Sequence, residues 1–301
     1  MKKRNLFSAF VMLLITAVSL TTASYAWFSV NTQVQLEGLD INVEVAEGIQ
    51  VSTDASNWKA AVDIADILAG YVGHTNQVPT MLKPVSTIGS QSTGNFEMYS
   101  GELVLTGTTT LTTAGPLAES GGNVDARYIA FDLFIQASVE TPIYLAPASD
   151  VVYESATETT AGLEYSSRVA FFNQGTDPTS TPATARALAG GTSATQVIWE
   201  PHALSHTTVA LGLGASTTEK TPYYGIKDAG TELPITDFAS QTDYFELVST
   251  ITPDTDAIPF AEDASSRIFT AGAGITKVRV FVWIEGQDID NENSASLGIA
   301  N

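Results

Sequence analysis

The sequence predicts an all-β fold, a β-sandwich of the jelly-roll type with one or a few short helices in its connections. Residues 128–139 and 275–285 alternate apolar side chains with the period of two that is typical of strands. Residues 56–69, with apolar side chains at helical spacing, are the best candidate for a helix. Segments rich in Thr, Ser, Ala and Gly separate the strand patterns. The strands do not alternate regularly with helices, so the sequence does not predict a parallel sheet.

The first 26 residues have the three parts of a secretory signal peptide. A basic run at 2–4 precedes an apolar run at 6–20. Ser24 and Ala26 then place small residues at positions −3 and −1 of a cleavage site before Trp27. An uncleaved membrane anchor is the alternative, but the apolar run is shorter than the ~20 residues that a spanning helix needs. We therefore expect a secreted protein, extracellular or at the cell surface.

The chain is strongly acidic and contains no cysteine. It has 13 Lys and Arg residues against 33 Asp and Glu residues, and loss of the three basic residues of the leader would change its net charge from −20 to −23. Such a surface repels nucleic acid and anionic lipid, so we expect neither nucleic acid nor, after cleavage, a membrane as partner. Disulfides, thiolate nucleophiles and Cys-bound metals are excluded. The mature chain, 27–301, is expected to form a single domain.

The mature N-terminus predicts a half-buried strand over residues 27–37. The apolar side of this strand consists of Trp27 at its start and of Phe28, Val30, Val34 and Leu36. At Gly38 the phase of the alternation changes, which separates the strand from the next pattern at 39–45. Two uses stay open: the strand pairs within its own subunit, or it is donated to a neighbouring subunit.

The helix and the remaining strands are also predicted from local sequence patterns. Asn57 is placed to cap the helix expected at 56–69, and Gly70 is placed to end it. Tyr128 and Phe134 make the second face of the strand at 128–139 partly apolar, as in a central strand covered on both sides. Further strands are expected at 143–145, 168–172, 197–199 and 244–251.

The histidines do not predict an active site. His202 and His206 have the four-residue spacing of two zinc ligands on a helix. A metalloprotease of the HExxH type needs Glu directly after the first His, and Ala203 stands there. We therefore interpret the pair as exposed loop histidines and expect no catalytic residue.

An acidic cluster near the C-terminus offers hard oxygen ligands. Asp288, Asp290 and Glu292 stand at alternating positions, a pattern that suits calcium. The Gly and Glu of an EF-hand loop are replaced by Asn293 and Ile299. A solvated acidic turn is the alternative, and no other cofactor is expected.

Several segments, in this order along the chain, resemble the TasA/camelysin family of secreted bacterial proteins. They are Tyr25-Ala26 followed by Trp27-Phe28-Ser29, then 128–134, 168–171, 198–201 and 283–288. The resemblance implies a jelly-roll-like sandwich that polymerises into extracellular fibres by donating its N-terminal strand. Some family members are described as metalloproteases.

These expectations combine into a structural function. We expect a subunit of an extracellular fibre or biofilm matrix whose partners are copies of itself, other matrix components or the cell wall. A secreted adhesin or carbohydrate-binding surface protein is the alternative on the same fold. A secreted metallo-hydrolase is the second alternative.

The predicted cleavage has a direct test. The mature chain should begin at Trp27, because Ser24 and Ala26 fit the small −3 and −1 subsites of a signal peptidase. N-terminal sequencing or the intact mass of the secreted protein measures this. A mature product that retains residues 6–20 would contradict both cleavage and free secretion.

Overall fold

The computed structural model describes ten stretches of the chain. These are residues 34–35, 49–92, 95–104, 110–119, 126–145, 149–151, 164–190, 196–234, 238–250 and 267–291. Within them antiparallel strands dominate and the helices are short, which confirms the predicted all-β class. The jelly-roll order of the strands stays a prediction.

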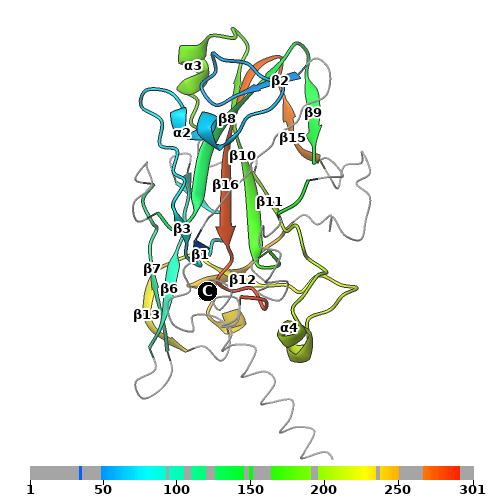
Figure 1. The fold of residues 1–301 in the computed structure, drawn as a ribbon. Helices are drawn as coiled ribbons and strands as arrows, with labels where there is room; N and C mark the ends of the chain where they lie inside the picture. The colour runs from blue at the N-terminus through cyan, green and yellow to red at the C-terminus, as the bar shows by residue number, and fades with distance from the viewer. Residues whose placement is uncertain are drawn as a thin grey trace, which may run out of the picture.

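A five-stranded antiparallel sheet runs lengthwise through the upper part of the molecule (Figure 1). Its strands, in spatial order, are β11 (Gln196–Trp199), β10 (Ser167–Asp177), β16 (Gly274–Ile284), β8 (Ile129–Ala137) and β2 (Ile49–Ser52). The central strand β16 pairs with β10 on one edge and with β8 on the other over most of its length. Its residue Val280, for example, stands opposite both Phe171 and Phe131.

Both faces of this sheet are covered, as the sequence predicts for residues 128–139. On one face Phe131 and Val280 belong to the main core, which also takes in Ile67 and Phe269 from outside the sheet. On the other face lies a second core of mixed aromatic and aliphatic side chains. Its sheet residues are Ala130, Ala170, Phe172, Ile198, Phe281 and Trp283, and Tyr128 joins them from directly before β8. Residues of both faces are therefore buried along β8 and β16.

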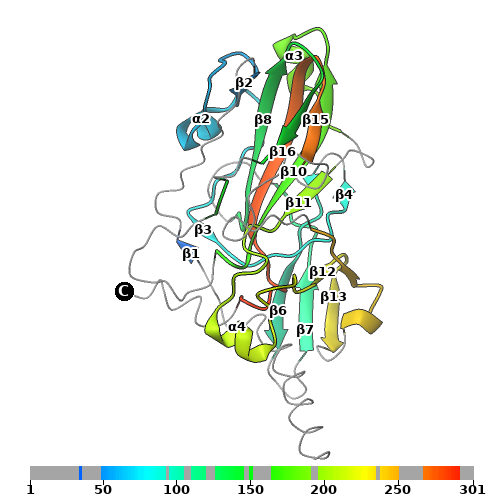
Figure 2. The ribbon, with the colours of Figure 1, turned by 90° about the vertical axis from the view of Figure 1, so that its right-hand side faces the viewer.

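Smaller sheets and helices surround the central sheet. Figure 2 shows the three-stranded sheet below it. The other strands are β9 (Thr141–Tyr144) with β15 (Arg267–Ala271), β13 (Gly230–Pro234) with β7 (Thr110–Ala114) and β6 (Ser100–Val104), β12 (Tyr224–Ile226) with β14 (Phe245–Leu247), β4 (Gln91–Ser92) with β5 (Asn95–Phe96), and β1 (Val34–Gln35) with β3 (Met81–Leu82). The helices are α2 (Ile64–Ala69), α3 (Pro182–Arg186), α4 (Thr208–Leu213) and the 3-10 turn η1 (Phe238–Ser240).

The helix predicted at 56–69 is shorter than expected and has a different cap. It begins at Ile64, because Asp63 and Asp66 form a reciprocal capping box at its N-terminus. Asn57 instead lies in a preceding loop, where its backbone and side-chain amides both donate to Asp54. Gly70 ends the helix as predicted. The strand predicted at 244–251 is also shorter and comprises only β14.

The second core predicts a large difference between two apolar truncations. Phe281 is fully buried, and its ring stacks on Phe96 with 4.5 Å between ring centroids. Phe281→Ala should lower the free energy of unfolding by about 3–5 kcal/mol, because it removes buried surface and leaves a cavity. Leu247→Ala, at a side chain that is 53% exposed, should change it by less than about 0.5 kcal/mol. Urea denaturation measures both, and similar values for the two variants would contradict this packing.

Candidate functional site

The predicted assembly strand enters the described structure only through β1. Val34 stands opposite Leu82, and Gln35 opposite Met81, in a two-residue antiparallel ladder. This ladder lies outside the five-stranded sheet. The partner residue Leu82 is buried in the main core, whereas Met81 is exposed. The cleavage residues Ser24, Ala26 and Trp27, and the other strand residues Phe28, Val30 and Leu36, lie outside the described residues.

A buried ionic cluster surrounds Arg168 on β10. This side chain is fully buried, on the sheet face that also carries Trp283 directly opposite. Its Nη2 donates to Glu200 Oε1 at 2.7 Å and also to the carboxylate of Asp288. Burial alone would lower the pKa of Arg168, but these two carboxylates raise it above its usual value. Arg168 therefore stays charged and joins the end of β11 to the segment after β16.

The same cluster contains a carboxylate that has no cationic partner. Glu285 is fully buried, and it accepts hydrogen bonds from Trp283 Nε1 and from the backbone of Gln287, each at 3.0 Å. None of the ion pairs among the described residues involves it. Burial therefore raises the pKa of Glu285 to about 7. Burial also raises the pKa of Asp288, although Arg168 opposes the shift.

The interpretation of His202 and His206 as exposed loop histidines is wrong. Their side chains are 5% and 4% exposed. His202 Nε2 lies 2.9 Å from the carbonyl oxygen of Val151. His206 Nδ1 lies 2.6 Å from Asp290 Oδ2, and its Nε2 lies 3.2 Å from the carbonyl oxygen of Ser216. The two rings thus bind different partners and do not converge as a zinc pair.

The surroundings of His206 favour its charged form. Both of its ring nitrogens face acceptors, which only the imidazolium can satisfy. Burial lowers the pKa of His206, but the hydrogen bond and charge of Asp290 raise it more. The other oxygen of Asp290 accepts from the backbone of Thr207, the N-cap of α4, at 2.7 Å. Asp290 thereby anchors the start of α4.

The acidic residues near the C-terminus are engaged inside the protein. Asp288 and Asp290 are 7% and 1% exposed, so the alternative of a solvated acidic turn is wrong. Asp288 binds Arg168 through one oxygen and the backbone of Asp290 through the other. Glu292 lies outside the described residues, so calcium binding by the full set stays a prediction. Among the described residues, no three His, Asp or Glu side chains are grouped as metal ligands.

A second ionic cluster, centred on Arg279 of β16, was not predicted. Arg279 donates to Asp132 Oδ1 at 2.8 Å and also pairs with Glu119. Lys277 approaches Asp132 Oδ2 at 3.3 Å, and Tyr71 donates to the same oxygen at 2.6 Å. The available signal was the pair of cations at alternating positions of a strand that is otherwise apolar. Such cations inside a central strand indicate buried ion pairs.

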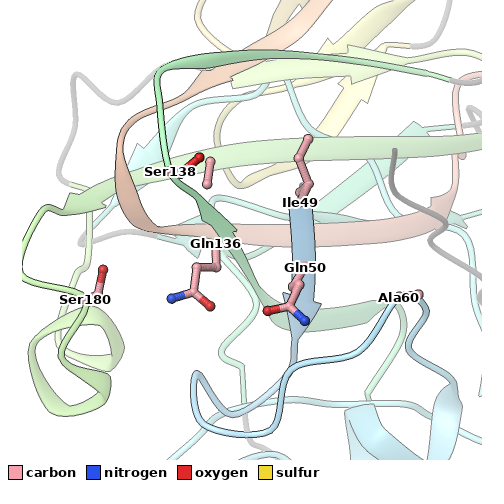
Figure 3. A pocket seen from close by; sticks show the side chains of 7 residues that line it. Ile49, Gln50, Ala60, Gln136, Ser138 and Ser180 are labelled. Atoms are coloured by element: carbon pink, nitrogen blue, oxygen red, sulfur yellow. The ribbon is translucent and has the colours of Figure 1, made fainter. Parts of the chain in front are cut away.

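A shallow hollow of about 550 Å³ lies at the upper end of the sheet (Figure 3). It is lined by Ile49, Gln50, Ala60, Gln136, Ala137, Ser138 and Ser180. None of these residues is ionisable, so the hollow offers no general acid or base and no carboxylate ligand. Its polar groups are amides and hydroxyls.

Comparison of the chain with protein-family models, with curated proteins and with solved structures finds no match in any of the three. In the part of the chain that the structure describes, no helix has the length and apolar character needed to cross a bilayer.

The Arg168 cluster predicts a pH-dependent cost of substitution. Arg168→Met should lower the free energy of unfolding by about 3–5 kcal/mol at pH 8, because it leaves Glu200 and Asp288 buried without their cation. Unpaired buried carboxylates have raised pKa values, so the stability they contribute is present at low pH and is lost as the pH rises. The loss should therefore be smaller at pH 5. Urea denaturation at the two pH values measures it.

The matched control for this substitution is Arg267→Met. Arg267 lies at the exposed start of β15, so its replacement should change stability by less than about 0.5 kcal/mol at either pH. An equal loss for both variants, or a loss at Arg168 that grows toward acid pH, would contradict the ionic arrangement described above.

Proposed function

We propose that this chain is a structural subunit of an extracellular fibre or biofilm matrix, and that subunits join by donating the N-terminal strand 27–36. The observation that carries the proposal is the two-residue ladder between β1 and β3. Because this pairing lies outside the five-stranded sheet, its exchange for the same pairing with a second copy leaves the hydrogen bonds of that sheet intact. Repeated head-to-tail exchange of one element produces an open filament unless the rotation closes a ring.

Strand donation is also supported by the pairing of the central sheet, whose five strands all lie at or after Ile49. Apart from β1, every described element begins at Ile49 or later. The described members of both cores and of both ionic clusters likewise lie downstream of Ile49 or at it. A subunit that donates residues 27–36 keeps all of these contacts.

The energy available from a donated strand is comparable to the free-energy cost of association. Ten extended residues reach about 33 Å. Burial of Phe28, Val30, Val34 and Leu36 at about 1.5–3 kcal/mol each contributes roughly 6–12 kcal/mol. Ladder hydrogen bonds add about 0.5–1.5 kcal/mol each. Association costs on the order of 4–15 kcal/mol, so the apolar face and the ladder are both needed.

The setting of this function is the one that the leader sequence favours, outside the cell or at its surface. The partners are other copies of the chain, together with matrix components or the cell wall. The hollow at the end of the sheet favours the alternative of a carbohydrate-binding surface protein, and the two functions are compatible in one subunit. No arrangement of the described residues favours a metallo-hydrolase.

Strand donation predicts how the chain behaves without residues 27–36 and how it responds to a peptide of that sequence. Deletion of residues 27–36 should leave a folded monomer that forms no fibres yet binds a synthetic peptide of that sequence, because the acceptor remains intact. Electron microscopy and sedimentation measure polymerisation, and fluorescence anisotropy measures peptide binding. If the deletion unfolds the domain and the peptide does not bind, the strand belongs to the core of its own subunit.

A pair of point variants sharpens this experiment. Val34→Asp adds a charge to the apolar side of the strand and should abolish fibres while leaving the melting temperature of the monomer unchanged. Gln35→Asp adds the same charge one residue along, on the polar side, and should leave fibres intact. Fibres of normal length from Val34→Asp would contradict the proposal.

A further inference from the structure

The hollow at the end of the five-stranded sheet brings together the side-chain amides of two glutamines. Gln50 of β2 and Gln136 of β8 stand directly opposite each other in the ladder. Figure 3 shows their amide groups side by side, between Ala60 and Ser180. Gln50 is exposed and Gln136 half-buried, and neither amide hydrogen bonds to the described part of the chain. Each amide offers two donors and one acceptor to a bound molecule.

The edge of the sheet adds backbone groups to the same hollow. Val51 exchanges both backbone hydrogen bonds, each 2.9 Å long, with Lys59 on the side away from β8. Because the direction of backbone groups alternates along a strand, the N–H and C=O of Ile49 also point away from β8. Among the described residues neither group has a hydrogen-bond partner. Ile49 lines the hollow, so a ligand lying there meets a further donor and acceptor.

The chemistry of the lining restricts the class of ligand. No ionisable side chain lines the hollow among the described residues, so a charged ligand finds no counter-charge in this lining. Anions are further disfavoured because the chain carries a net charge of −20. A wholly apolar ligand would leave the amides and the Ile49 backbone without partners, which is costly. The remaining class is a neutral molecule with many hydroxyl or amide groups.

We propose that this hollow is a binding site for a neutral oligosaccharide, held by the amides of Gln50 and Gln136 and by the backbone of Ile49. The volume of about 550 Å³ lies within the range of small-molecule sites. Adjacent sugar hydroxyls, or an N-acetyl group, match the paired donors and acceptors of an amide. The lining includes no aromatic ring for a sugar to stack on, so binding is weak, with Kd on the order of a millimolar. The site goes beyond the proposed structural function and does not depend on polymerisation.

Two neutral trisaccharides and one acidic trisaccharide test this site on the full mature chain. Cellotriose presents hydroxyl groups only, N,N′,N″-triacetylchitotriose presents N-acetyl groups, and trigalacturonate presents carboxylates. Saturation-transfer NMR, which works on monomers and polymers alike, should show binding of at least one neutral trisaccharide and none of trigalacturonate. Failure of both neutral probes at 10 mM, a concentration well above the expected Kd (roughly tenfold), would overturn the proposal, as would preferential binding of the acidic probe.

Substitutions then place the binding in the hollow. Gln136→Ala and Gln50→Ala should each weaken the affinity measured by titration calorimetry about fivefold, because each removes hydrogen bonds to the ligand. Ala60→Trp should abolish binding by filling the hollow from an exposed position, which does not disturb the core. Gln241→Ala, a glutamine outside the lining, is the matched control and should bind as the unsubstituted chain does.

These variants can contradict the site even where the protein binds sugar. Unchanged affinity in Gln136→Ala and Ala60→Trp would show that the sugar binds elsewhere and would overturn the proposal. Fibre formation should be the same in all of these variants. The sugar site and the strand-donation function can therefore fail separately.

Discussion

Hydrogen bonding along both edges of β16 is the interaction on which the rest of this structure depends. This strand pairs with β10 and β8 over most of its length, so both of its faces must be covered. On one face Val278 and Val280 enter the main core. On the other face Phe281 and Trp283 enter the second core, and the strand leads directly into the buried Glu285.

The position of β16 also explains the two ionic clusters. Arg279 lies on the same face as Phe281 and pairs with Asp132 of the neighbouring strand β8. Arg168 of β10 stands opposite Trp283, nearer the other end of the strand, and binds Glu200 and Asp288. Because water cannot reach these positions, each arginine requires its carboxylates. The clusters thereby specify which loops close over the sheet.

The two proposed interactions with other molecules use parts of the chain outside the centre of the sheet. The described core contacts lie at or downstream of Ile49, and residues 27–36 are the segment proposed for exchange between subunits. At the upper end of the sheet, β2 covers only the last residues of β8, from Phe134 to Ala137. Gln50, Gln136 and the backbone of Ile49 meet at this end of the sheet. The proposed function and the proposed sugar site thus both use parts of the chain that lie outside the two described cores.

The sequence alone was sufficient for the elements whose structure follows from local pattern. Alternation along 128–139 and 275–285 predicted β8 and β16 and the burial of both faces of β8, because side-chain direction in a strand has a period of two. The cap of α2 was misplaced, since Asn57 and Asp63 are both plausible caps and only the reciprocal bonds with Asp66 select the second. Tertiary structure alone decided the ionic partners. Glu200 and Asp288 lie 32 and 120 residues from Arg168, and His206 lies 84 residues from Asp290. Side chains so far apart in the chain leave no local pattern, because folding of the sheet brings them together.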